Sequence, residues 1–284
     1  MTRWVRRTAL VLGGLGLAIL LVLAGGTFLW KRATGRAVAL LGKGPLAPAR
    51  YSPDQLAGLP PPVVRYFEFA LVPGQPLVRH ARVTQAGTFA RARDAWAPFR
   101  AVEDFAVWPP GFVWDASIRM APLLPARVRD SYLGGEGNMH GTLGGVVPIV
   151  DQRGTPEMAG AALLRYLAEG AWLPTALLPS AGVRWEAVDD NTARATLTDA
   201  GTTVSMDVHF GPRGEIDRIT AQRYRDVDGT PVLTPWRGTF GDYARVNGMQ
   251  VPRESEVGWE LPDGWLPYFR ARNVKLEYTF RETP

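Results

Sequence analysis

The chain has 284 residues, no cysteine and a formal net charge of +5. The lack of cysteine excludes disulfides, thiolate metal sites and cysteine nucleophiles. All of the positive excess lies in the first fifty residues, which carry eight basic and no acidic side chains, whereas residues 51–284 carry 24 basic and 27 acidic ones. Because the body is mildly acidic, the basic charge of the whole chain does not indicate nucleic-acid binding.

The first predicted element is an uncharged, apolar helix from Thr8 to Trp30. At 1.5 Å per residue it spans roughly 34 Å, which is enough to cross the core of a bilayer. Trp4 and Trp30 lie at its two ends, where aromatic side chains are expected at the membrane surface. We therefore predict four segments: a basic tail 1–7, a transmembrane anchor 8–30, a basic linker 31–50 that contains Pro and Gly, and a single domain 51–284.

A cleaved signal peptide is the alternative to a retained anchor. The triplet Ala37-Val38-Ala39 has the small-x-small pattern that a signal peptidase accepts. The apolar core of a signal peptide is usually about 7–15 residues, however, and this one is longer, which favours retention. Cleavage after Ala39 stays an open alternative at this point.

The body begins after Gly42–Pro53, a stretch with three prolines that predicts a short linker. A compact helix is predicted over 63–71. From Leu77 the pattern is that of β-strands, and Asp190-Asn191, Asp228-Gly229 and Asn247-Gly248 are hairpin-type dipeptides. The predicted strands are 77–90, 98–107, 111–120, 127–134, 138–149, 183–188, 192–199, 202–210, 215–225, 232–245, 250–260 and 268–280.

One helix interrupts the strands. Thr155 is a good N-cap, Pro156 suits the first helical position, and Gly170 ends the element. The strands alternate between apolar and polar residues, as Thr203–Phe210 does, which indicates antiparallel sheet with one solvated face. We predict an α+β fold: an N-terminal transmembrane helix, then a curved, mainly antiparallel, half-barrel-like sheet packed on two or three helices.

Two segments could carry chemistry. The glycine-rich segment Gly134–Gly145 contains Glu136 and His140, which could meet across a tight hairpin as acid and base or as two metal ligands. Glycines at this spacing also mark bulged or crowded hairpins, and no third ligand is evident. We therefore expect no metal and no cofactor, and the Glu136/His140 pair, with Asp115 and Arg119 beside it, is kept only as an alternative, hydrolase-like site.

The second segment, Pro109–Pro122, predicts a strand with an apolar face and a polar face. The polar face and the residues that follow it form a predicted cluster of Asp115, Arg119, Arg129 and Asp130. Aromatic and apolar side chains on the inner faces of a curved sheet could line a site for an apolar molecule, although they fill cores more often. The candidate ligand-binding residues are Trp96, Phe99, Phe112, Trp114, Met120, Tyr132, Trp236, Tyr243 and Trp259.

Three stretches of the chain, residues 96–132, 163–179 and 235–259, carry a family resemblance. They resemble a bacterial family of N-terminally membrane-anchored proteins of unknown function, over roughly residues 60–280. The segment from Asp242-Tyr243 to Val251-Pro252 also resembles, more generically, the closing strands of lipoprotein-carrier half-barrels. That second resemblance implies a curved sheet around a cavity for acyl chains, by analogy of fold alone.

These observations predict a membrane-anchored, non-catalytic protein that binds a lipid or another apolar molecule at the membrane surface. The expected partners are membrane lipids and an apolar small molecule, without nucleic acid. We expect a single-pass protein of the inner membrane with its body on the exported side, because the N-terminal tail is very short. A hydrolase-like enzyme and a tethered protein-interaction scaffold are the two alternatives.

Overall fold

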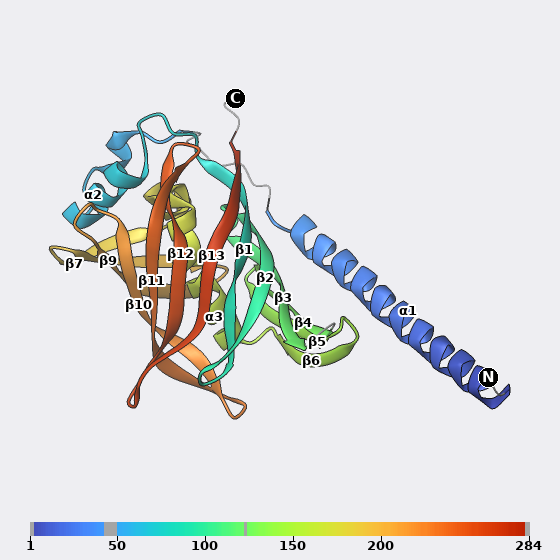
Figure 1. Cartoon of the computed structure of the whole chain (residues 1–284). Helices are drawn as coiled ribbons and strands as arrows, with labels where there is room; N and C mark the ends of the chain where they lie inside the picture. The colour runs from blue at the N-terminus through green and yellow to red at the C-terminus, as the bar shows by residue number, and fades with distance from the viewer. Residues whose placement is uncertain (1–2, 43–49, 122–123, 282–284) are drawn as a thin grey trace.

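The computed structural model describes residues 3–42, 50–121 and 124–281. It consists of a long N-terminal helix, α1, beside one strongly curved sheet of 13 strands (Figure 1). All pairings are antiparallel, and neighbouring strands follow each other in sequence except where β1 pairs with β13. The first and last strands therefore meet in the middle of the sheet, in the order β6-β5-β4-β3-β2-β1-β13-β12-β11-β10-β9-β8-β7.

The helices are α1 (Arg3–Ala39), α2 (Pro61–Ala70) and α3 (Pro156–Glu169), with short 3-10 turns at Pro53–Leu56, Gly170–Trp172, Pro174–Leu177 and Pro179–Ala181. The strands are β1 (Val78–Ala92), β2 (Ala95–Ala106), β3 (Gly111–Ala121), β4 (Leu124–Leu133), β5 (Glu136–Leu143), β6 (Val147–Arg153), β7 (Arg184–Asp189), β8 (Thr192–Asp199), β9 (Thr202–Phe210), β10 (Ile216–Val227), β11 (Thr230–Val246), β12 (Met249–Leu261) and β13 (Gly264–Phe280).

The predicted fold class is confirmed: an apolar N-terminal helix precedes a curved antiparallel sheet that packs on helices. One strand prediction is wrong, because 138–149 is not continuous. Gly144 and Gly145 have positive φ values of 62° and 80° and form the turn between β5 and β6. Helix α1 also continues nine residues past Trp30, into the expected linker, whose residues 43–49 lie outside the described part of the chain.

The concave face of the sheet encloses α3 and the 3-10 turns that follow it (Figure 1). The side chain of Thr155 accepts a hydrogen bond from the backbone of Met158, and this cap starts α3 as the sequence predicts. Strand β2 shows the alternation that builds the core, since Phe99 and Phe105 point inward and are buried while Arg100 is exposed. The core consists of such inward residues packed on the apolar side of α3.

Antiparallel pairing places alternate turns at the same edge of the sheet. We call one edge the lower edge; it holds the C-terminal ends of β1, β3, β5, β10 and β12 and lies at the bottom of Figure 1. Helix α1 runs along the convex face from the upper edge, where Gly42 approaches Pro109, to the lower edge, where Gly26 approaches Gly145. Its N-terminal turns then continue past the lower edge, away from the sheet (Figure 1).

Candidate functional site

Helix α1 docks on the convex face through Trp30. The indole Nε1 donates a hydrogen bond of 2.8 Å to Asp115, and only 4% of the residue is exposed. The ring stacks on His140 with 5.5 Å between centroids, and the Arg129 guanidinium lies 4.8 Å from the ring centre. Trp30 is thus buried against protein, whereas the sequence predicted an aromatic side chain at the membrane surface.

The seat of Trp30 is a row of polar residues that crosses four strands. Asp115 on β3 pairs with Arg129 on β4, which pairs with His140 on β5 and through it with Asp151 on β6. Arg129 also donates to Thr34 of α1 at 3.1 Å, which adds a polar contact one helical turn along. An aromatic ring placed between a carboxylate, a guanidinium and an imidazole is held by several directional contacts at once.

The structure divides the predicted polar cluster. Asp115 and Arg129 belong to the seat of Trp30, but Asp130 points to the opposite, concave face, where it binds Arg165. Arg119 is exposed and lies four residues from Asp115 on the same strand, a separation of about 13 Å. The four residues therefore do not form one site.

A second contact between α1 and the sheet is a glycine pair at the lower edge. A Cβ atom on Gly26 would lie 2.6 Å from the backbone oxygen of Gly145, whereas one on Gly25 would meet nothing within 4 Å. Gly145 in turn needs its positive φ of 80° for the β5–β6 turn. The helix can approach this turn so closely only because both residues lack a side chain.

Gly26→Ala is therefore expected to loosen α1, because the new methyl group must push the turn away. We expect faster tryptic cleavage after Lys31 and Arg32 in the full-length protein in lipid nanodiscs, followed by mass spectrometry. Gly25→Ala is the matched control and should cleave at the wild-type rate. Equal rates for the two variants would contradict the close packing.

On the concave face, α3 is fixed by a buried ionic cluster around Arg165. The guanidinium donates to Glu103 at 2.7 Å, to Asp130 at 2.8 Å and to Glu169 at 2.9 Å. It also lies 4.8 Å from the ring centre of Phe112. Burial lowers the pKa of Arg165, but the three surrounding carboxylates raise it above its usual value, so the side chain stays charged.

The carboxylates of the cluster outnumber the cation, which favours a bound proton. Burial raises the pKa of Glu103 well above its usual range, against the opposing effect of Arg165, and burial likewise raises the pKa of Glu169. The Oε2 atoms of both glutamates have no hydrogen-bond donor among the described residues. A proton kept on Glu103 supplies that donor and joins the two carboxyl groups.

This proton predicts a pH dependence of stability. Because folding raises the pKa of Glu103, its neutral form stabilises the folded state. This stabilisation is complete below the unfolded pKa near 4.5 and is lost as pH rises through the folded pKa. Glutamine stays neutral at every pH, so Glu103→Gln does not lose this stabilisation. The melting temperature of the variant minus that of wild type should therefore rise from pH 5 to pH 8. The exposed Glu186→Gln is the control, and a constant difference for Glu103→Gln would contradict a neutral Glu103.

Below α3, aromatic side chains of β1, β12 and β13 form what we call the aromatic shelf: Phe89, Trp259, Tyr268 and Phe269. The Trp259 ring stacks on Tyr268 at 5.7 Å, and Phe89 meets Tyr268 edge-on at 6.2 Å. The Tyr268 hydroxyl accepts hydrogen bonds of 2.9 Å from Trp236 and from Arg223, and Arg223 also reaches the backbone of α3 at Ala161. These contacts place the shelf on the concave face.

The shelf is incompletely covered. All four members are partly exposed, whereas Phe99, which stacks on Phe269, is buried. One reason is the position of α3, which packs mainly on β3, β4, β5, β9 and β10 rather than on the strands of the shelf, β1, β12 and β13. The result is an apolar aromatic surface near the lower edge, beside the sheet's core.

The candidate ligand-binding residues do not form one site. Trp259 belongs to the shelf; Trp96 lies on the convex face under Arg270, and Tyr243 lies under α2, edge-on to Phe69. Met120 is exposed near the lower edge. The remaining five are buried core residues: Phe99, Phe112, Trp114, Tyr132 and Trp236.

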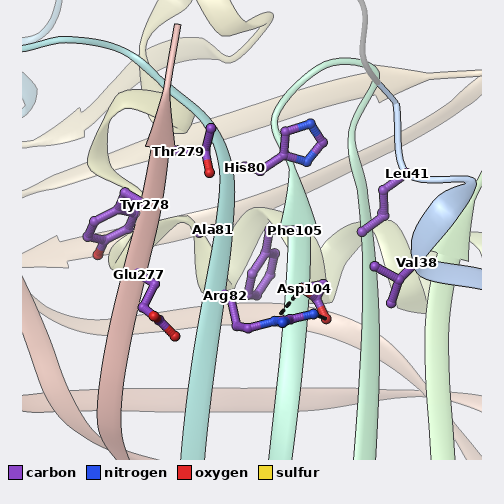
Figure 2. A pocket seen from close by; sticks show the side chains of 10 residues that line it. All are labelled: Val38, Leu41, His80, Ala81, Arg82, Asp104, Phe105, Glu277, Tyr278 and Thr279. Carbon is purple, nitrogen blue, oxygen red and sulfur yellow. Dashed lines mark hydrogen bonds and ion pairs between the residues drawn. The ribbon is translucent and has the colours of Figure 1, made fainter. Parts of the chain in front are cut away.

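Two hollows lie on the convex face. The first, of about 290 Å³, is lined by His80, Arg82, Asp104 and Glu277 and bordered by Val38 of α1 (Figure 2). Arg82 and Asp104 form an ion pair of 2.8 Å across its floor. Figure 2 shows the charged groups of this hollow on the sheet side, whereas Val38 and Leu41 line it on the side of α1.

The second hollow is about 560 Å³ in volume and spans β1, β11, β12 and β13. Arg270 pairs with Glu256 at 2.5 Å, and Arg272 pairs with Glu254 and with Asp242. Because these charges already have partners, this hollow does not suit an apolar molecule.

The candidate acid and base do not meet. Glu136 and His140 lie on one strand, β5, four residues and therefore about 13 Å apart, which exceeds the reach of a hydrogen bond even through one water. His140 instead contacts Trp30 and lies 3.4 Å from Asp151. Among the described residues, no three His, Asp or Glu side chains are grouped closely enough to hold a metal ion.

The solved structures that are similar to this chain include the following two. One is a LolA superfamily protein from Nitrosomonas europaea, with 10% identity and a TM-score of 0.35 over 78% of this chain and 93% of that one. The other is a beta-barrel-like protein of a domain of unknown function (DUF1849) from Brucella abortus, with 10% identity and a TM-score of 0.31 over 72% and 99% of the two chains. Residues 49–271 match the model of a family of unknown function, DUF6544. The chain belongs to that family.

Proposed function

We propose that this protein is a single-pass, membrane-anchored binding protein that holds a lipid or another apolar molecule against the aromatic shelf without catalysing a reaction. The observation that carries the proposal is the position of the shelf. It is apolar, partly exposed and close to the lower edge, and α1 passes that same edge with its most apolar turns. An acyl chain leaving a bilayer around α1 would enter the domain at the edge that holds these rings.

A retained anchor is part of the proposal. Removal of residues 1–39 would leave Asp115, Arg129 and His140 without the buried ring of Trp30. It would also remove Ala37 and Val38 from the end of α1, where both pack against the cluster of the buried Leu41. A domain that has evolved a seat for the helix fits an anchor better than a signal peptide that is discarded.

The side of the membrane is also part of the proposal. We place the sheet domain on the exported side of the inner membrane, with the arginines that precede the uncharged stretch of α1 on the cytoplasmic side. Intact-mass analysis of the protein extracted from membranes should give a chain that still contains α1; a chain that begins at Leu40 would contradict the anchor.

Native mass spectrometry of the full-length protein, purified in a mild detergent, tests the bound molecule. We expect added masses that differ by units of two carbons, as acyl chains do. Trp259→Ala removes one ring of the shelf and should lower the bound fraction. Trp265→Ala is the matched control, because Trp265 is a partly exposed indole on the convex face that stacks with Arg237. Protein without added mass, or equal loss in both variants, would contradict the proposal.

A further inference from the structure

The turn between β5 and β6 contacts α1 within the apolar stretch of the helix. A Cβ atom on Gly144 would lie 2.8 Å from the side chain of Leu23, and Gly145 approaches Gly26. Both helix residues precede Trp30 and lie within the uncharged stretch from Thr8. The lower edge of the sheet and the membrane-spanning part of α1 therefore overlap along the helix axis.

The length of the helix makes this overlap informative. Only the 15 residues from Thr8 to Val22 lie beyond the contact with the turn, and they span about 22 Å as a helix. The hydrocarbon core of a bilayer is about 30 Å thick, which requires about 20 residues. If the helix enters the hydrocarbon core at Thr8, it leaves the core near Phe28. Leu23 and Gly26 then lie inside the core, about 7–8 Å and about 3 Å from its surface.

The composition of the hairpin fits that depth. Residues 141–150, which include the turn and both adjoining strand ends, contain no charged side chain. Val146, Val147 and Ile149 are 43%, 57% and 53% exposed. By contrast, the β1–β2 turn carries the ion-paired Arg93, and the β10–β11 turn carries Asp226 and Asp228.

We propose that the β5–β6 turn is a second membrane contact, which inserts Val146, Val147 and Ile149 into the outer part of the bilayer beside α1. The proposal rests on the proposed function, because it requires that α1 spans a membrane. Apolar side chains buried 5–10 Å into the boundary between headgroups and acyl chains stabilise such a contact by the hydrophobic effect. Because α1 is docked on the sheet through Trp30, this second contact fixes the tilt of the domain against the membrane, so that the aromatic shelf keeps one orientation toward it.

The natural lack of cysteine allows a direct test with single-cysteine variants of the full-length protein. Leu15→Cys lies in the helix beyond the sheet, Val147→Cys and Ile149→Cys lie in the hairpin, and Val188→Cys is an exposed apolar position on β7. Each variant is labelled with bimane and reconstituted in phosphatidylcholine vesicles that carry doxyl groups either near the headgroup or deep in the acyl chain.

We expect the deep doxyl group to quench the label at Leu15, and the shallow one to quench the labels at Val147 and Ile149 by about twofold, as for a depth of 5–10 Å. The label at Val188 should keep its fluorescence in both kinds of vesicle. Quenching at Leu15 without quenching at Val147 and Ile149 would overturn the hairpin contact and leave the anchor in place. No quenching at Leu15 would overturn the anchor and the hairpin contact together.

Discussion

Replacing Arg165 by methionine is expected to destabilise the domain by about 3–5 kcal/mol, because three buried carboxyl groups, of which Asp130 and Glu169 are charged, would lose their shared cation. Glu103 is fully buried, and Asp130 and Glu169 are nearly so. Methionine keeps much of the length and the apolar stem of arginine, so the loss of charge dominates. Urea unfolding followed by tryptophan fluorescence measures the change in the free energy of unfolding.

Arg194→Met is the matched control for this experiment. Arg194 pairs with Asp207 at 2.7 Å on an exposed part of the sheet, where an ion pair contributes about 0–1 kcal/mol. A loss for Arg165→Met as small as that for Arg194→Met would mean that the buried cluster does not hold α3 in the sheet.

Trp30→Ala should detach α1 from the convex face while the sheet domain stays folded. Truncation of a buried tryptophan typically costs about 3–5 kcal/mol in a core, and we expect about 2–4 kcal/mol at this helix–sheet contact. Even 2 kcal/mol raises the detached population about 30-fold. Tryptic cleavage after Lys31, Arg32 and Arg36 in nanodiscs should accelerate by at least this factor.

Leu29→Ala controls for the loss of an apolar side chain from the same part of the helix. Leu29 is next to Trp30 but is 64% exposed and contributes nothing to the seat on the sheet. Its cleavage rate should match that of wild type. If Trp30→Ala and Leu29→Ala were equally slow to be cut, α1 would not depend on Trp30 for docking.

The strands could be predicted where local chemistry dictates them. Alternation from Thr203 to Phe210 predicts β9, and the dipeptides Asp228-Gly229 and Asn247-Gly248 predict turns that the structure has, with positive φ at all four residues. The break at Gly144-Gly145 was missed, because apolar β-branched residues continue on its C-terminal side and resemble a continuing strand. The pairing of β1 with β13 joins strands from the two ends of the domain, so no local pattern in the sequence predicts it.

The candidate site was harder to predict, because its members are distant in sequence. Trp30 meets Asp115 across 85 residues, and Arg165 meets Glu103 across 62. One signal was nevertheless present: Glu103 occupies an inward position of β2, in phase with Phe99 and Phe105. A charged residue at an inward position predicts a buried partner, although the sequence does not say which one.

The shelf was predicted in part. Trp259 was among the candidate ligand-binding residues, but Phe89, Tyr268 and Phe269 were not. Their exposure depends on where α3 ends above the sheet, which is a property of the tertiary packing. Five of the other candidates turned out to be core residues, in keeping with the usual role of inward aromatic side chains.

The most direct measurement is the mapping of lipid adducts on the full-length protein. Reconstituted membranes that contain a phospholipid with a diazirine on its acyl chain are illuminated, and the modified peptides are identified by mass spectrometry. The account predicts adducts on the aromatic shelf, at Phe89, Trp259, Tyr268 or Phe269, in addition to those on α1. Adducts confined to α1 and the turns of the lower edge would contradict a binding role for the concave face.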